Sequence, residues 1–188
     1  MEAGFILNNT SPPSNMKVVH IAGISGVGKS FVCDRLTGAN PRVKCIDLDS
    51  FFQKHHGMAW ERLENEIGKA RAANNDDILI LNGMHRIPFR CDLRIVLVSA
   101  DMGKTYREYM LRNLDAIVSN EKRIRRIMRA SDVEQMQGRI VGALWANFDI
   151  VQTFEDYQKE AGQYNRSMRK RGYVTATQKE AQTLVSKM

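Results

Sequence analysis

The stretch that decides the fold is Gly23-Ile24-Ser25-Gly26-Val27-Gly28-Lys29-Ser30, which matches the pattern G-x-x-x-x-G-K-S. It lies between an apolar run at residues 18–22 and a helix-like stretch at residues 31–36. A loop that wraps phosphate groups points backbone N–H groups inward with no Cβ in the way, which glycine permits. The helix that follows adds the positive end of its dipole. The sequence therefore predicts a phosphate-binding loop between a strand and a helix.

The residue types of this loop predict a site for ATP and Mg²⁺. The Lys29 ammonium is expected to reach the terminal phosphates, and the Ser30 hydroxyl is expected to complete the Mg²⁺ shell. The loop backbone and the first turn of the helix supply the other contacts. The predicted nucleotide-binding residues are Gly23, Ser25, Gly26, Val27, Gly28, Lys29, Ser30 and Phe31.

The bulk properties predict one basic domain. The chain has 188 residues and a formal charge of +7, which favours anionic partners such as nucleotides, nucleic acid or acidic membranes. Residues 1–15 are expected to form a flexible tail before a single domain at residues 16–188. No window approaches the length of a membrane span, and the three cysteines lack the short paired spacing of a zinc site. These features predict a soluble cytoplasmic protein with reduced thiols and no membrane partner.

Apolar, β-branched runs alternate with helical stretches along the chain. This alternation predicts an α/β fold with a five-stranded parallel sheet between two layers of helices. Strands are expected at residues 17–22, 42–47, 77–82, 93–98 and 173–177. Helices are expected at residues 29–37, 58–74, from 102 toward 129, from 132 to 171 with a break near 147–149, and 178–188.

Two carboxylates follow the second predicted strand, in the order Asp47-Leu48-Asp49. If extended geometry continues to Asp49, both point to the same side, at the sheet edge that also carries the phosphate loop. Asp47, the deeper of the two, would then hold a metal-bound water, and Asp49 would accept the proton of an attacking hydroxyl. The alternative is that both aspartates cap the turn after the strand.

The phosphate loop, the run Asp49-Ser50-Phe51-Phe52 and the strand end Asn82-Gly83 resemble the small P-loop kinases, among them the uridine and nicotinamide riboside kinases. The spacing of Asp47 and Asp49 resembles that of shikimate kinase. The resemblance implies a P-loop NTPase fold with a helical lid, and Asp49 as the carboxylate on the acceptor side. The sequence departs from the uridine kinase relatives at Asn82, where they carry Glu. Because Asn supplies no charge to a metal, metal binding shifts toward Asp47.

The acceptor site is expected beside the segment Gly83-Met84-His85-Arg86. Arg86 could hold an anionic part of the acceptor, and His85 could hydrogen-bond it; the alternative for His85 is a packed or surface imidazole. Arg62 and Arg90 also favour an anionic acceptor. The predicted acceptor-binding residues are Asp49, Phe52, His85 and Arg86.

A cationic helix is expected at residues 121–129. The resemblance implies that residues 119–135 form a lid in which Arg123 or Arg126 stabilises the transferring phosphoryl group. Two alternatives stay open: an ordinary solvated helix face, or a track for a polynucleotide backbone. A later basic cluster could extend such a track, and its members are Arg166, Arg169, Lys170 and Arg171.

The leading functional prediction is an ATP- and Mg²⁺-dependent kinase that phosphorylates a hydroxyl of a nucleoside-like or other small molecule. The paired aspartates favour a hydroxyl acceptor because a phosphate acceptor needs no base, although a nucleotide acceptor stays open. A second possibility is a kinase for a hydroxyl on DNA or RNA, at a 5′ end or on a hydroxylated base. A third is an NTP-hydrolysing switch with no small acceptor, and a fourth is a protein that binds nucleotide only for structure.

Overall fold

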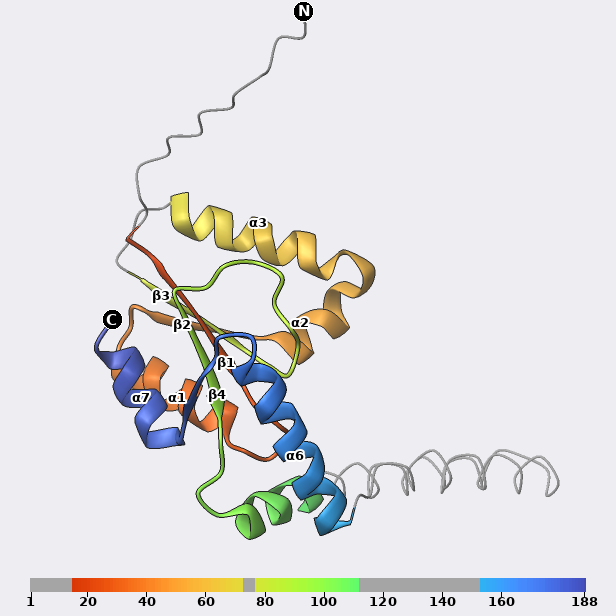
Figure 1. Cartoon of the computed structure of the whole chain (residues 1–188). Helices are drawn as coiled ribbons and strands as arrows, with labels where there is room; N and C mark the ends of the chain where they lie inside the picture. Colours follow the sequence, from red (N-terminus) through yellow and green to blue (C-terminus); the bar gives the residue numbers. More distant parts are fainter. Residues whose placement is uncertain (1–14, 73–76, 112–152) are drawn as a thin grey trace, which may run out of the picture.

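The central feature of the fold is a parallel sheet of five strands in the order β2-β3-β1-β4-β5 (Figure 1). The computed structural model describes residues 15–72, 77–111 and 153–188. The strands are β1 Lys17–Ala22, β2 Val43–Asp47, β3 Ile78–Asn82, β4 Leu93–Leu97 and β5 Val174–Ala176. The predicted α/β fold with a five-stranded parallel sheet is confirmed.

The helices connect these strands and follow most of the predicted pattern. They are α1 Lys29–Ala39, α2 Leu48–His55, the short 3₁₀ helix η1 His56–Met58, α3 Ala59–Ala72, residues 102–111, α6 Phe154–Arg169 and α7 Gln178–Ser186. Asp101 caps the helix at 102–111 as predicted, because its Oδ1 accepts the N–H of Lys104 at 3.0 Å. No helix in the described ranges combines the length and the apolar character needed to cross a membrane.

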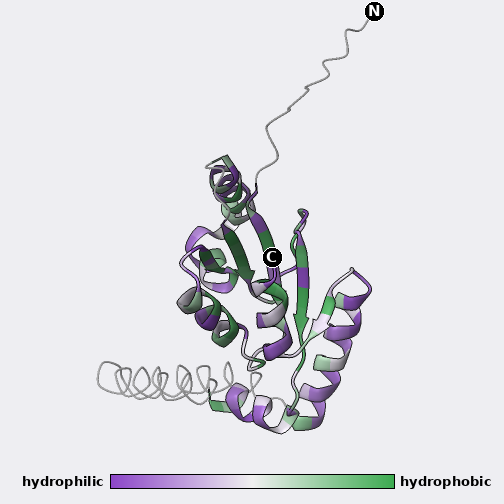
Figure 2. Ribbon diagram, turned by 90° about the vertical axis from the view of Figure 1, so that its left-hand side faces the viewer, coloured by the Kyte–Doolittle hydropathy of each residue, from purple (hydrophilic) through white to green (hydrophobic). Residues whose placement is uncertain are grey.

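Helices cover both faces of the sheet because successive side chains of a strand point to opposite sides. Val19 and Ile21 of β1 pack in one cluster with α1 and α7, whereas Val18 packs on the other face with α2 and α3. The end of α6 covers this second face at β1 and β4, where Met168 packs against Val96. Figure 2 shows the apolar strands between helices whose outer surfaces are hydrophilic.

The order of the strands places the glycine loop at the point where the chain changes direction. After β1 the chain runs through α1 to β2, which lies at the edge of the sheet with β3 between it and β1. After β3 it crosses β1 on the opposite face, where Ile87 packs in the α3 cluster, and enters β4. In open α/β sheets, ligands bind outside the carboxyl ends of the strands at such a switch point. The loop that follows β1 lies at this position.

The condition that would place Asp47 and Asp49 on the same side, extended geometry as far as Asp49, is not met. The strand β2 ends at Asp47, and α2 begins at Leu48. The carboxylate of Asp47 starts this helix, because its Oδ1 accepts the N–H of Ser50 at 2.8 Å. Leu48 is fully buried and packs close to Gly83. Asp47 therefore has the capping role that was the alternative interpretation, and Asp49 lies in the first turn of α2.

A buried polar pair lies inside the second face of the sheet. His20, in the middle of β1, is fully buried, and its Nδ1 lies 2.6 Å from the hydroxyl of Tyr173. Burial lowers the pKa of His20 to about 3 and raises the pKa of Tyr173 to about 12. The pair is therefore uncharged at neutral pH.

The α3 contact with the sheet predicts the effect of removing Leu63, which is fully buried in the second-face cluster. Leu63→Ala is expected to lower the free energy of unfolding by about 2–5 kcal/mol because it removes apolar contacts and leaves a cavity. Glu64→Ala, at the next and exposed position, is expected to change it by less than about 0.5 kcal/mol. Urea denaturation followed by circular dichroism measures both; equal losses would show that α3 does not pack as described.

Burial of His20 predicts a pH dependence of stability. Because the folded-state pKa lies below the unfolded value of 6.5, the unfolded chain binds the extra proton, and stability is lost as the pH falls below 6.5 toward 3. The slope is expected to approach about 1.4 kcal/mol per pH unit. The double variant His20→Leu/Tyr173→Phe is expected to show a shallower decline between pH 6.5 and 5 in the same denaturation measurement. An unchanged slope in the double variant would contradict the conclusion that buried His20 causes this loss of stability.

Candidate active site at the carboxyl edge of the sheet

The glycine loop joins β1 to α1 through two left-handed backbone positions. Gly26 has φ of 83°, and Gly28, the N-cap of α1, has φ of 89°. A side chain at either position would be strained, which explains the glycines. Gly28 supplies no side-chain hydrogen bond to the helix. The first turn of α1 therefore lacks the side-chain cap that commonly satisfies its N–H groups, an arrangement suited to an anion.

Side chains from three helices hold the carbonyl groups of this loop. The Lys29 Nζ donates to the carbonyls of Gly23 at 2.9 Å and Ile24 at 3.2 Å. The Tyr157 hydroxyl, from α6, donates to the carbonyl of Ser25. The Gln178 Nε2, from α7, donates to the carbonyl of Val27 at 2.9 Å. The path of the loop is thus fixed by its own Lys29 and by two donors, Tyr157 and Gln178, that lie more than a hundred residues away in the sequence.

A cavity of about 710 Å³ opens beside the loop. This volume falls within the usual range of small-molecule sites, about 300–1,000 Å³. Gly26, Gly28 and Phe31 form one wall, and the Phe31 ring is 48% exposed. The other walls come from the segment after β4 and from the turn between β5 and α7: Val98, Ser99, Ala100, Asp101, Lys104, Thr105, Glu108, Thr177, Gln178 and Lys179. Sequence reasoning missed these residues because no local pattern links them to the loop.

Asp47 and Asn82 form a hydrogen-bonded pair at the ends of β2 and β3. The two residues are paired across the strands, and the Asn82 Nδ2 donates to the Asp47 Oδ2 at 3.3 Å. Asn82 is only 2% exposed, and its Oδ1 has no hydrogen-bond partner in the described structure. A buried amide oxygen without a donor is costly, so this atom fits a site for a water or hydrated ion.

Asp49, His85 and Phe52, all predicted acceptor-binding residues, lie together at the same edge. The His85 Nε2 is 3.1 Å from the Asp49 Oδ1, and both side chains are about half exposed. The Phe52 ring lies over His85 with ring centroids 4.5 Å apart, and it also packs on Trp60 at 4.5 Å. The imidazole can therefore orient a carboxylate that stays open to solvent.

Tyr164 of α6 contacts the segment after β3 that carries His85, and sequence reasoning missed it. Its hydroxyl donates to the carbonyl of Met84 at 3.2 Å. Burial, together with the nearby Tyr173, raises its pKa to about 12. Tyr164 therefore joins α6 to the segment that follows β3.

The structure does not describe every predicted site residue. Arg123, Arg126 and the whole predicted lid at residues 119–135 lie outside the described ranges. Arg90, predicted to favour an anionic acceptor, lies at the opposite end of the sheet, beside Leu93 at the start of β4. Arg62 hydrogen-bonds the His55 ring at 2.9 Å and lies on the surface of α3.

A scan against models of protein families finds no matching family, and a search of curated proteins finds no relative of this chain. The assignment of the site therefore depends on its own geometry.

The left-handed geometry of Gly28 predicts the effect of adding a Cβ there. Gly28→Ala is expected to lower the free energy of unfolding by about 1–2 kcal/mol because of backbone strain, and its Cβ would also clash with the Gln178 amide. Gly38→Ala, in α1 with open space around it, is expected to be neutral or stabilising by up to about 1 kcal/mol. Thermal denaturation of the two variants compares them. Equal stability would contradict the left-handed cap.

Proposed function

We propose that this chain is an ATP- and Mg²⁺-dependent kinase that transfers the γ-phosphoryl group to a hydroxyl of a nucleoside-like small molecule. The observation that carries the proposal is that the uncapped glycine loop, whose carbonyls are already bound by protein donors, and the Asp49 carboxylate follow strands that end at the same carboxyl edge of the sheet. This arrangement supports a P-loop kinase fold of the kind that the sequence resembles.

The residues beside the loop fit a hydrated magnesium ion. Mg²⁺ keeps several waters and takes one or two carboxylates together with substrate phosphates. The exposed Ser30, at the start of α1, and the Asp47 carboxylate would hold the ion or its waters. The unpartnered Oδ1 of Asn82, hydrogen-bonded through its amide to Asp47, would accept from such a water. When bound, the ion would neutralise negative charge on the β- and γ-phosphates.

Lys29 and the loop would bind the phosphates of ATP, and the 710 Å³ cavity would take its nucleoside part. The Lys29 ammonium exchanges its contacts with Gly23 and Ile24 for phosphate oxygens in this proposal. The exposed Phe31 ring offers an apolar surface for a planar base. These roles extend the predicted nucleotide-binding set to the wall formed by Thr177, Gln178 and Lys179.

Asp49 would act as the general base. The acceptor hydroxyl gives its proton to the Asp49 carboxylate while its oxygen forms a bond to the γ-phosphorus. The bond from that phosphorus to the β–γ bridging oxygen breaks, and ADP leaves with the electron pair. His85 would orient the carboxylate, and Phe52 would pack against the acceptor. The catalytic roles of Arg123 and Arg126 in this proposal rest on the sequence alone.

Transfer of labelled γ-phosphate from ATP tests the proposal, with an acceptor panel of nucleosides, nucleotides, shikimate-like acids and hydroxyl-bearing DNA. Asp49→Asn is expected to keep ATP binding but to lose about 10²–10⁴-fold in transfer rate because the base is removed. Lys29→Ala is expected to lose both ATP binding and transfer.

Asp34→Asn and Lys54→Ala are matched controls because both residues are exposed and lie outside the site. Both are expected to behave as the unsubstituted chain does. Full transfer by Asp49→Asn would remove its assignment as the base. Release of phosphate into water with no acceptor labelled would instead favour the NTP-hydrolysing switch.

A further inference from the structure

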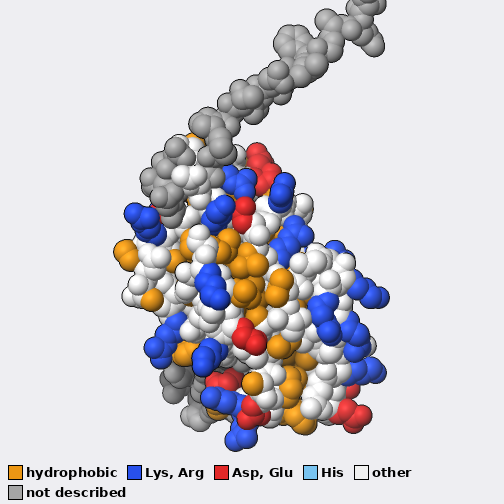
Figure 3. All heavy atoms as spheres, turned by 60° about the vertical axis from the view of Figure 1, so that its left-hand side comes forward, with side chains coloured by type: hydrophobic (Ala, Val, Ile, Leu, Met, Phe, Trp, Pro, Cys, Tyr) orange, Lys and Arg blue, Asp and Glu red, His pale blue; other side chains and the backbone are white. Residues whose placement is uncertain are grey.

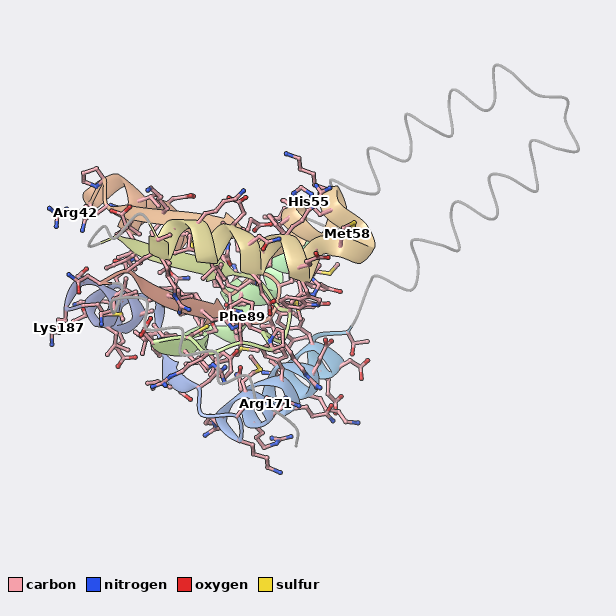
Figure 4. All side chains as sticks on the ribbon, turned by 90° about the horizontal axis from the view of Figure 1, so that it is seen from above. Arg42, His55, Met58, Phe89, Arg171 and Lys187 are labelled. Carbon is pink, nitrogen blue, oxygen red and sulfur yellow. The ribbon has the colours of Figure 1, made fainter. Side chains whose placement is uncertain are left out.

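A second cavity, of about 530 Å³, lies at the amino edge of the sheet. We call it the amino-edge cavity, and its lining residues are Pro88, Phe89, Arg90, Cys91, Asp92, Leu93, Arg94, Arg171, Gly172 and Val174. These residues lie just before β4 and β5 or at the start of these strands, whereas the glycine loop and Asp49 follow β1 and β2. Figure 4 looks down on the molecule from above and labels two of these residues, Phe89 and Arg171. The proposed kinase site does not use this cavity.

The charge of the amino-edge cavity is strongly positive. Arg90, Arg94 and Arg171 contribute three guanidinium groups, against the single carboxylate of Asp92. The Asp92 Oδ2 already accepts the N–H of Val18 at 2.8 Å. Neither Arg90 nor Arg171 forms an ion pair with any residue in the described ranges. Both are exposed, so their charges are available to an external anion.

The cavity is built on fixed backbone and a fixed central guanidinium. The Arg94 Nη2 donates to the carbonyl of Phe89 at 2.8 Å, and its guanidinium carbon lies 5.7 Å from the centroid of the Tyr173 ring. Arg171 lies in the turn that ends α6, where its N–H donates to the carbonyl of Met168 at 2.9 Å. The Arg94 guanidinium and the backbone that carries Arg171 are therefore held in place before any ligand arrives.

We propose that the amino-edge cavity binds phosphate groups of a single-stranded nucleic acid. Guanidinium groups form paired hydrogen bonds with phosphate oxygens, and a cavity lined by both arginines and an aromatic ring is typical of single-strand sites. The exposed basic side chains of Arg169 and Lys170 extend the positive surface along the end of α6. The surface is therefore larger than a single phosphate group needs. Figure 3 shows Lys and Arg side chains spread over one face of the molecule, with acidic side chains between some of them.

This proposal does not depend on the proposed kinase activity. Binding at the amino-edge cavity needs neither ATP nor Mg²⁺ and uses none of the residues assigned to transfer. Arg90 thus changes from a predicted contact of a small acceptor to a predicted contact of a polyanion.

Fluorescence anisotropy with a labelled 20-nucleotide single strand, without ATP, tests the proposal. The double variant Arg90→Gln/Arg171→Gln is expected to weaken binding by about ten-fold or more, because two charge-assisted contacts are lost. The slope of log affinity against log salt concentration is expected to become shallower by about 1.4, since each phosphate contact on a single strand contributes about 0.7. Affinity is also expected to rise with strand length.

The matched control is Arg35→Gln/Arg107→Gln, which removes the same charge at exposed positions that do not line the cavity. It is expected to bind nearly as the unsubstituted chain does, and thermal melts check that both double variants are folded. Equal binding by the cavity variant and the unsubstituted chain overturns the proposal, and so does an equal loss in the control. Two further results overturn the proposal. The first is full displacement of the strand by millimolar inorganic phosphate together with an affinity that does not depend on strand length. The second is a cavity variant that binds the strand as the unsubstituted chain does but has lost binding to phosphatidylserine vesicles, measured in parallel.

Discussion

The fixed path of the loop after β1 is the constraint on which the site depends. β1 is the middle strand of the sheet, and it is buried over most of its length, so its carboxyl end has little freedom to move. Three side chains, Lys29, Tyr157 and Gln178, take up carbonyl groups of the loop. Lys29 belongs to the loop itself and begins α1, whereas Tyr157 and Gln178 come from helices distant in the sequence. The path of the loop therefore depends on the packing of α6 and α7 as well as on α1. Folding of the whole domain and formation of the anion site are thus coupled.

The local features of the fold could be predicted from sequence, whereas the contacts between distant segments could not. The glycine loop, the buried strands and the Asp101 cap each depend on neighbouring residues, and all are found as predicted. The missed helix α2 carried a readable signal, since Leu48, Phe51 and Phe52 have helical spacing behind an Asp47 cap. The order Asp47-Leu48-Asp49 also fits the polar–apolar alternation of a strand, so the pattern alone does not distinguish a strand from the start of a helix.

The candidate site was predictable to a similar degree. Asp49, His85 and Phe52 were expected near the acceptor and do lie together, although the Asp49–His85 pair joins residues 36 positions apart. The contributions of Tyr164 and of the Thr177–Lys179 turn were not predictable, because each depends on how α6 and α7 pack against the sheet. Arg90 was expected to favour an anionic acceptor, but it lies away from the predicted acceptor residues, because the ten residues between β3 and β4 return to the amino edge of the sheet.

The central claim is that the loop at residues 23–30 binds the phosphates of a nucleotide. Hydrogen–deuterium exchange, measured with and without Mg²⁺ and a non-hydrolysable ATP analogue, tests it most directly. The account predicts slower exchange in the loop, in the first turn of α1 and in the turn at residues 177–179, with little change at the amino edge of the sheet. Unchanged exchange in the loop at saturating analogue would contradict it.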